Sequence, residues 1–169
     1  KSNEVRLGSP SARWLMGNNL FVGSNGAMSW LVVSNGARVE NFDGILANSS
    51  ASSNNVALVT GSGSTWSNRG DLTVGFSGRD NQLLVSNGGF VFNRCGYLGR
   101  QPGSSNNVAR ISGSGSVWSN QFYLMVGGND RSNRLIVEAG GLVTCSDGIV
   151  SGSSSSGNSE VLVTGPGSL

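Results

Sequence analysis

Histidine is absent from this 169-residue chain, lysine occurs once and cysteine twice, and these scarcities exclude several kinds of chemistry. Without histidine, neither a Ser-His-Asp nor a Cys-His nucleophilic set can be assembled. The chain also has no Walker loop, no Cys-x-x-Cys pair and no calcium-binding nonapeptide, and Gly127-Gly128-Asn129-Asp130 fits an ordinary turn. We therefore predict that the chain is not an enzyme and has no catalytic, cofactor-binding or metal-binding residues.

Charge is scarce as well, because only 12% of the residues are charged, about half the usual share of a soluble domain. The formal net charge is +2, and the arginines are spread along the chain instead of forming the contiguous basic stripe of a nucleic-acid-binding protein. No run approaches the ~20 apolar residues of a membrane-spanning helix. We expect no nucleic-acid partner, no membrane insertion and almost no helix.

The sequence does contain an internal repeat with a period of 52 residues. Residues 31–39, 83–91 and 135–143 are similar to one another, and each segment begins with two aliphatic residues followed by valine. The same spacing separates three tryptophans, Trp14, Trp66 and Trp118. A repeat at a fixed period is typical of solenoid proteins. It predicts one repeat domain, 1–169, with units at about 4–55, 56–107, 108–159 and, in part, 160–169.

Each of these units is itself double, because two aliphatic columns recur every 26 residues. The first column is Val5, Leu31, Ala57, Leu83, Ala109, Leu135 and Val161. The second, two residues later, is Leu7, Val33, Val59, Val85, Ile111, Val137 and Val163. Residues two apart on a β-strand share one face, so both columns are predicted to be buried. Glycine, serine and asparagine follow each pair, which indicates turns.

Three short strands and three turns in each half of the unit predict one coil of a right-handed parallel β-helix, an all-β fold. Successive coils would stack at about 4.8 Å, the distance between hydrogen-bonded strands. Trp66 falls seven residues after Val59, whereas Val91 falls six after Val85. We therefore expect an extra residue at the Gly-Ser-Gly-Ser segment and tryptophan alternating with valine up one inner corner. Core packing is the preferred interpretation of the tryptophans, and an exposed sugar-stacking platform is the alternative.

The cysteines and acidic residues do not assemble into a site in this scheme. Cys95 and Cys145 would be two coils apart, roughly 9–10 Å, which exceeds the ~7 Å between Cα atoms that a disulfide allows. Two free thiols are predicted. Asp43 and Asp147 share a column but would be about four coils apart, roughly 19 Å, whereas paired glycosidase carboxylates lie about 5–10 Å apart. No acid pair is expected.

A third column lies between the two buried ones and should point outward. Five of its seven members are aliphatic, and an exposed apolar strip of this kind marks a contact surface. Trp30 lies beside it, at a position where the two following 52-residue units have the polar residues Gln82 and Arg134. The possible interface consists of Trp30, Val32, Leu58, Leu84, Ile136 and Leu162. The alternative is a strand that is half-buried or covered by the chain's own loops.

Polar residues also recur at fixed intervals, such as Asn54-Asn55 with Asn106-Asn107, and Asn68 with Asn120. Stacked turns of identical polar residues hydrogen-bond to one another along a solenoid. We interpret them as structural ladders, and a polar surface that binds glycans is the alternative.

The pattern N-x-L-x-V-x-x-G-G-x-V followed by G-x-L-x-V-G resembles the β-strand repeats of bacterial autotransporter passengers and related giant surface proteins. Residues 81–91 carry the first part, and residues 70–75 and 105–109 continue it. The resemblance covers nearly the whole chain. It implies a surface-exposed β-helical stalk, an extracellular or outer-membrane-associated location and, often, adhesion.

These observations together lead us to expect a structural or adhesive segment of a bacterial surface or secreted protein, acting as a stalk, filament or adhesin. The repeat phase at both ends leads us to expect a piece of a longer repetitive protein. The partners would be further copies of the chain, assembled laterally or end to end, or cell-surface glycans. The alternative is a glycan-binding or polysaccharide-degrading β-helix similar to a lyase or a phage tailspike.

Overall fold

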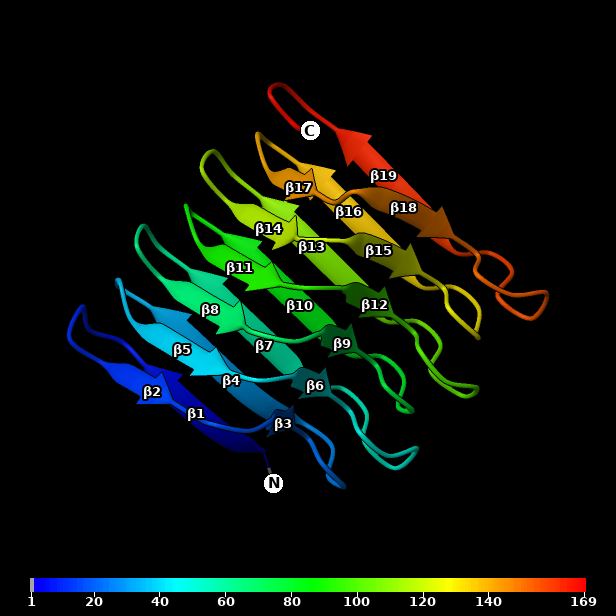
Figure 1. Cartoon of the computed structure of the whole chain (residues 1–169), viewed down its shortest axis with the longest axis horizontal. Helices are drawn as coiled ribbons and strands as arrows, with labels where there is room; N and C mark the ends of the chain where they lie inside the picture. The colour runs from blue at the N-terminus through cyan, green and yellow to red at the C-terminus, as the bar shows by residue number, and fades with distance from the viewer. Residues whose placement is uncertain (1) are drawn as a thin grey trace.

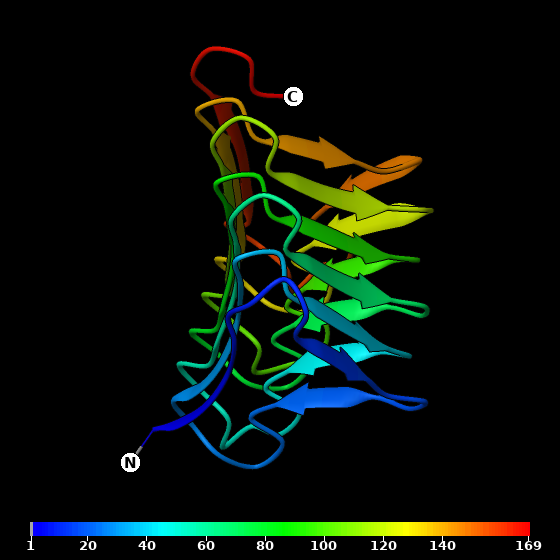
Figure 2. The ribbon, with the colours of Figure 1, turned by 90° about the vertical axis from the view of Figure 1, so that its left-hand side faces the viewer.

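The computed structural model describes residues 2–169, and Lys1, the only lysine, lies outside them. These residues form a right-handed parallel β-helix of three sheets with no helix, which confirms the predicted fold class (Figure 1). Every pair of neighbouring strands is parallel, so each coil hydrogen-bonds to the coils before and after it. Figure 2 shows the short turns between the second and third sheets stacked along one edge of the molecule.

The three sheets run along the axis of the β-helix and contain seven, six and six strands. The first sheet contains β1 (Asn3–Leu7), β4 (Ser29–Ser34), β7 (Val56–Thr60), β10 (Gln82–Ser86), β13 (Val108–Ser112), β16 (Arg134–Glu138) and β19 (Glu160–Thr164). The second sheet contains β2 (Arg13–Leu15), β5 (Arg38–Asn41), β8 (Thr65–Asn68), β11 (Phe90–Asn93), β14 (Val117–Asn120) and β17 (Leu142–Thr144). The third sheet contains β3 (Leu20–Val22), β6 (Gly44–Leu46), β9 (Leu72–Val74), β12 (Gly96–Leu98), β15 (Tyr123–Val126) and β18 (Asp147–Val150).

In the first sheet the register is the same at every step, so the two predicted aliphatic columns lie strand over strand. Val33 pairs with Val59, which pairs in turn with Val85, and the first two are fully buried. Val5 and Val161, in the two outermost strands, are partly exposed, because only one neighbouring coil covers each of them. The columns are therefore the continuous apolar wall that the pattern predicts.

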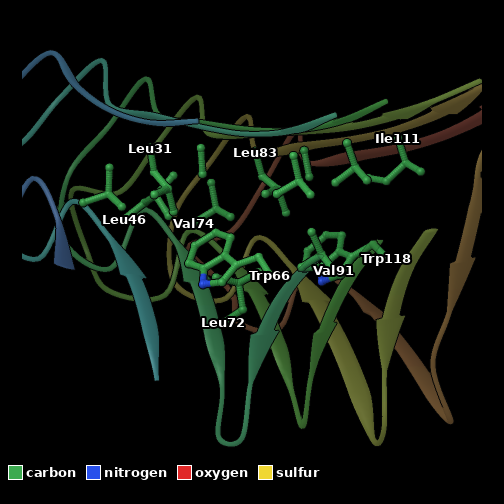
Figure 3. Close-up of a cluster of buried hydrophobic side chains, with 14 of the residues drawn as sticks. Leu31, Leu46, Trp66, Leu72, Val74, Leu83, Val91, Ile111 and Trp118 are labelled. Carbon is green, nitrogen blue, oxygen red and sulfur yellow. The ribbon is translucent and has the colours of Figure 1, made fainter. Parts of the chain in front are cut away.

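In the second sheet, the number of residues between paired positions on neighbouring strands alternates between a larger and a smaller value. Trp66 pairs with Val39 on one side and Val91 on the other, so the predicted alternation of tryptophan and valine is confirmed. The extra residue lies in the turn before Trp66, where Gly61 and Gly63 adopt φ angles of 91° and 77° that favour glycine. Trp66 is fully buried, as is Trp118, and Figure 3 shows both among the core side chains, so they are not a sugar-stacking platform.

In the third sheet these two residue separations differ more strongly. Leu72 pairs with Gly44 on the preceding coil and with Gly96 on the following coil. A Cβ atom on Gly44 would approach Trp66 Cζ2 to 2.8 Å and Leu72 Cδ1 to 2.9 Å. The tryptophan and leucine of one coil thus fill the space left by glycine in the adjacent coil. This fit explains why the unit of the sequence is two coils and not one.

Asparagine ladders run inside two corners. Asn55, Asn81, Asn107 and Asn133 are fully buried, and the side chains of the first three donate to the Oδ1 of the next at 2.9–3.1 Å. These Oδ1 atoms also accept backbone N–H groups of the preceding coil at 2.9–3.0 Å.

At the corner between the second and third sheets, the ladder is interleaved with the buried tryptophans. Asn41 donates to Asn68 at 2.7 Å and accepts from Trp66 Nε1 at 2.7 Å. The arrangement recurs two coils later around Trp118, where Asn93 plays the part of Asn41. The predicted structural ladders are confirmed, and no buried side-chain polar atom of residues 2–169 lacks a hydrogen-bond partner.

Candidate functional site

The outer face of the third sheet brings two carboxylates into adjacent coils. Gly44 pairs with Leu72, so the residues before them, Asp43 and Asp71, are aligned, and Asp71 N donates to Asp43 Oδ1 at 2.8 Å. The expectation that no acid pair forms is therefore wrong. A uniform period hid the pair, because it aligns Asp43 with Arg69 and not with Asp71.

Arg100 lies between Asp71, one member of this pair, and a group of aromatic rings. Its Nη1 is 3.9 Å from Asp71 Oδ2, and its Cζ is 4.2 Å from the centroid of the Tyr97 ring and 5.6 Å from that of Phe76. A guanidinium above aromatic rings is held by cation–π attraction. Since the side chain of Arg100 is only 35% exposed, the stacked rings fix the position of its donors.

Tyr97 and Tyr123 complete the group, which we call the Asp–Arg–Tyr cluster (Asp43, Asp71, Tyr97, Arg100 and Tyr123). Their hydroxyl groups are hydrogen-bonded, and their rings meet edge to face with centroids 5.5 Å apart and planes at 89°. Burial raises the pKa of Tyr97 strongly, and the hydrogen bond between the two hydroxyl groups raises it further. Tyr97 therefore stays a neutral hydroxyl at all physiological pH values.

The two cysteines are free, as predicted, with Cys95 buried and Cys145 exposed. Burial raises the pKa of the Cys95 thiol, and the negative charge of Asp71 raises it further. Partial desolvation by neighbouring atoms, followed by the negative charge of Asp147, also raises the pKa of the exposed Cys145 thiol. Both groups are therefore held as thiols, which are poor nucleophiles compared with thiolates.

A ridge of exposed aromatic residues follows the corner beside the cluster. Backbone hydrogen bonds align Phe42, Gly70, Arg94 and Phe122 on four successive coils. Phe42 is 47% exposed and Phe122 42% exposed, and the guanidinium of Arg94 lies 5.4 Å from the Phe122 ring centroid. We call Phe42, Arg94 and Phe122 the Phe ridge. Sequence reasoning missed it because a uniform period aligns Phe42 with Asn120 and not with Phe122.

The predicted interface on the first sheet is less exposed than an open strip. Trp30 and Leu162 are exposed, but Val32 and Ile136 are only 2% and 4% exposed, and Leu58 and Leu84 are half-buried. The alternative of a half-buried strand therefore describes the centre of this face. Whether the six residues form an interface stays a prediction.

Charged side chains cover part of the same face. Arg110 and Glu138 pair at 2.6 Å across β13 and β16, and Arg134 and Glu160 pair at 2.7 Å across β16 and β19. Ile136 lies on the strand that both ion pairs share. Long charged side chains cover apolar surface with their stems, so this end of the strip is a poor contact surface for an apolar partner.

Comparison with known proteins adds no relative: no protein-family model, no curated protein and no solved structure matches the chain. Among residues 2–169, no group of three or more His, Cys, Asp or Glu side chains is placed to bind a metal ion. The same residues include no helix long and apolar enough to cross a membrane. The exposed Phe ridge and the Asp–Arg–Tyr cluster, in which Tyr97 is buried and the other side chains are half-buried, are the candidate binding residues.

Proposed function

We propose that this chain is a rigid structural and adhesive segment of an extracellular or cell-surface bacterial protein, acting as a stalk, filament or adhesin. The observation that carries the proposal is the continuity of the hydrogen-bonded network along the axis. All three sheets are unbroken from the first coil to the last, and the buried asparagine ladder links four consecutive coils. The resemblance to autotransporter passengers and related surface repeats supports the same role.

The physical advantage of such a segment is length without flexibility. Six coils at about 4.8 Å each place the two ends roughly 29 Å apart along the axis. Repeat proteins of this kind bury a continuous core between neighbouring coils, so every coil is held by the coils on either side of it. The low charge keeps neighbouring rods from repelling one another strongly.

Rigidity is tested by a distance measurement that uses the exposed native thiol. A spin label on Cys145 and a second label on an Asn18→Cys variant would lie near the same corner, about five coil steps or ~24 Å apart along the axis. Double electron–electron resonance should give one narrow distance distribution. A broad or multiple distribution would contradict a rigid stalk.

Adhesion is tested with beads coated with the purified chain. The proposal predicts that coated beads are retained on bacterial or host cell surfaces under flow, whereas beads coated with an unrelated protein of equal net charge are washed off. Equal loss of both kinds of beads would remove the adhesive part of the proposal and leave the stalk. Because the two experiments measure different properties, their outcomes are independent.

A second function, glycan binding, is favoured by the Asp–Arg–Tyr cluster. Asp43 and Asp71 are aligned one coil apart, about 4.8 Å, and Arg100 lies beside Asp71. Carboxylates and a fixed guanidinium can hydrogen-bond sugar hydroxyl groups, while exposed rings such as Phe122 can cover the apolar face of a sugar. The chain would then hold a glycan along the corner, parallel to the axis.

Glycan arrays with matched variants test this second function. Binding by the native chain that is lost in Asp71→Asn and in Phe122→Ala, but kept in Glu160→Gln on the first sheet, would support it. Binding that is unaffected by all three changes would place the glycan elsewhere. Release of shorter sugars from a bound polysaccharide would assign a polysaccharide-degrading activity to the same face.

A further inference from the structure

Three Asn-Gly pairs occur in the chain, and the hydrogen bonds around one of them differ from those around the other two. They are Asn25-Gly26, Asn35-Gly36 and Asn87-Gly88. In an Asn-Gly pair, the backbone nitrogen of glycine can attack the side-chain amide of asparagine, because glycine has no Cβ to obstruct the approach. The reaction requires that this nitrogen is accessible and that the backbone can adopt the ring-closing geometry.

At Asn35 and Asn87, serines of the next coil hold the glycine nitrogen. Gly36 N donates to Ser64 Oγ at 3.0 Å, and Gly88 N donates to Ser116 Oγ at 3.1 Å. The serine hydroxyls are themselves fixed, since each donates to a backbone carbonyl of its own coil at 2.8 Å. A hydrogen-bonded N–H does not lose its proton readily and does not point at the amide carbon of the preceding residue.

The asparagine side chains of these two turns are also held in place. Asn35 Nδ2 donates to the carbonyl of Gly8 at 3.2 Å, and Asn87 Nδ2 donates to Thr60 Oγ1 at 3.1 Å. Both asparagines have left-handed φ angles, 52° and 51°, fixed within tight turns. The leaving amide nitrogen is thus anchored, and ring closure would require the turn to open.

Asn25-Gly26 lies in the loop between β3 and β4, and among residues 2–169 no acceptor holds the leaving amide nitrogen, Asn25 Nδ2. Both residues are exposed, and within the part of the chain from 2 to 169 the Gly26 N–H donates to no acceptor. A Cβ on Gly26 would have no atom within 4 Å, so the loop has room to rearrange. Ser49 Oγ donates to Asn25 Oδ1 at 2.7 Å, and such a donor stabilises the negative charge that develops on this oxygen during attack at Cγ.

We propose that Asn25 is the site at which this chain deamidates spontaneously, and that Ser64 and Ser116 protect Asn35 and Asn87. The Gly26 nitrogen loses its proton to water and attacks Asn25 Cγ, so a C–N bond forms. The bond from Cγ to Nδ2 then breaks, and Nδ2 leaves as ammonia after taking up a proton. Water opens the resulting succinimide at either of its two C–N bonds and gives aspartate or isoaspartate, with no oxidant or reductant required.

The modification changes the surface of the first coils in a defined way. It adds one carboxylate beside Ser49 and lowers the formal net charge of the chain from +2 to +1. The isoaspartate product also lengthens the backbone of this loop by one bond. The tight turns of the following coils keep their amides, so the stacked serine–glycine contacts preserve the rest of the rod during long exposure to water.

Peptide mapping by mass spectrometry of the full chain, incubated at mildly alkaline pH, tests the proposal. In the native chain, deamidation is expected at Asn25 well ahead of Asn35 and Asn87. Ser64→Ala should raise the rate at Asn35 alone by about five- to tenfold, which is the effect of losing one hydrogen bond. Ser116→Ala should do the same at Asn87 alone, so that each variant is the control for the other. Ser49→Ala should slow the reaction at Asn25.

Two results would overturn the proposal. One is a native chain in which Asn35 or Asn87 deamidates as fast as Asn25. The other is a serine variant that keeps its circular dichroism and melting temperature but shows no change at the facing asparagine. A serine variant that unfolds would accelerate all three sites together, and urea-unfolded native chain supplies that reference pattern.

Discussion

The alternation of large and small residues between coils predicts that adding one methyl group at Gly96, as in Gly96→Ala, lowers the stability of the fold. A Cβ atom there would overlap Asn120 Oδ1 and would lie 2.7 Å from Leu124 Cδ1 and 2.9 Å from Trp118 Cζ2. Leu124 can rotate away, but the other two side chains are fixed, because Trp118 Nε1 and Asn120 Oδ1 both bond the amide of Asn93 at 2.7 Å. Gly96→Ala must therefore strain the core or break one of these hydrogen bonds.

The size of the effect follows from that choice. Overpacking a core by one methylene typically costs about 1–3 kcal/mol, and a lost hydrogen bond costs about 1 kcal/mol. Because two of the three contacts cannot yield, we expect Gly96→Ala to lower the free energy of unfolding by about 2–3 kcal/mol. The glycine has no left-handed φ, so backbone strain does not contribute.

Gly148 provides the matched control, because it occupies the same column two coils later and pairs with Leu124 from the other side. A Cβ on Gly148 would meet no atom within 4 Å. Gly148→Ala should be neutral or should stabilise the fold by about 0.4–1 kcal/mol through the unfolded chain. Urea unfolding followed by tryptophan fluorescence measures both variants, and the m-value should not change. Equal destabilisation by the two substitutions would refute the proposed fit between coils.

Three further predictions concern the ladder, the thiols and the first sheet. Asn81→Ala should lower the free energy of unfolding by about 2–4 kcal/mol in the same urea assay, because it leaves buried donors and acceptors of two coils unpaired, and an unchanged midpoint would count against the ladder. Cys145 should react with maleimide while the buried Cys95 does not, and equal labelling of both by mass spectrometry would be the contrary result. Since the pKa of Cys145 is raised, the rate of its reaction with maleimide should keep increasing with pH above the range of an ordinary thiol. Leu58→Asp should abolish any lateral association seen by analytical ultracentrifugation without unfolding the half-buried strand, and association that persists would exclude this face.

The sequence is sufficient to predict the fold because paired residues on neighbouring strands of the first sheet are always the same number of residues apart. Its aliphatic columns repeat at one fixed interval, so strand, face and period are all visible in one alignment. The tryptophan corner was predictable for a similar reason, since one extra residue before Trp66 accounts for the change of register.

The candidate site was not predictable because the offset changes from sheet to sheet. Asp43 and Asp71 are aligned because the turn between the second and third sheets differs in length from one coil to the next. A uniform period in the sequence does not reveal this difference in turn length. Arg100 reaches the cluster from the loop that follows β12, at a position that no column of strand residues contains. The burial of Val32 likewise depends on how neighbouring side chains fold over it, which alternation alone does not determine.

Electron microscopy of the natural protein, combined with its intact mass, tests the central claim most directly. The account predicts long polypeptides that form straight rods or bundles with the cross-section of one three-sheet coil. Dispersed compact particles built from chains near 17.4 kDa, with activity on a polysaccharide, would contradict the structural role and favour the glycan-directed one.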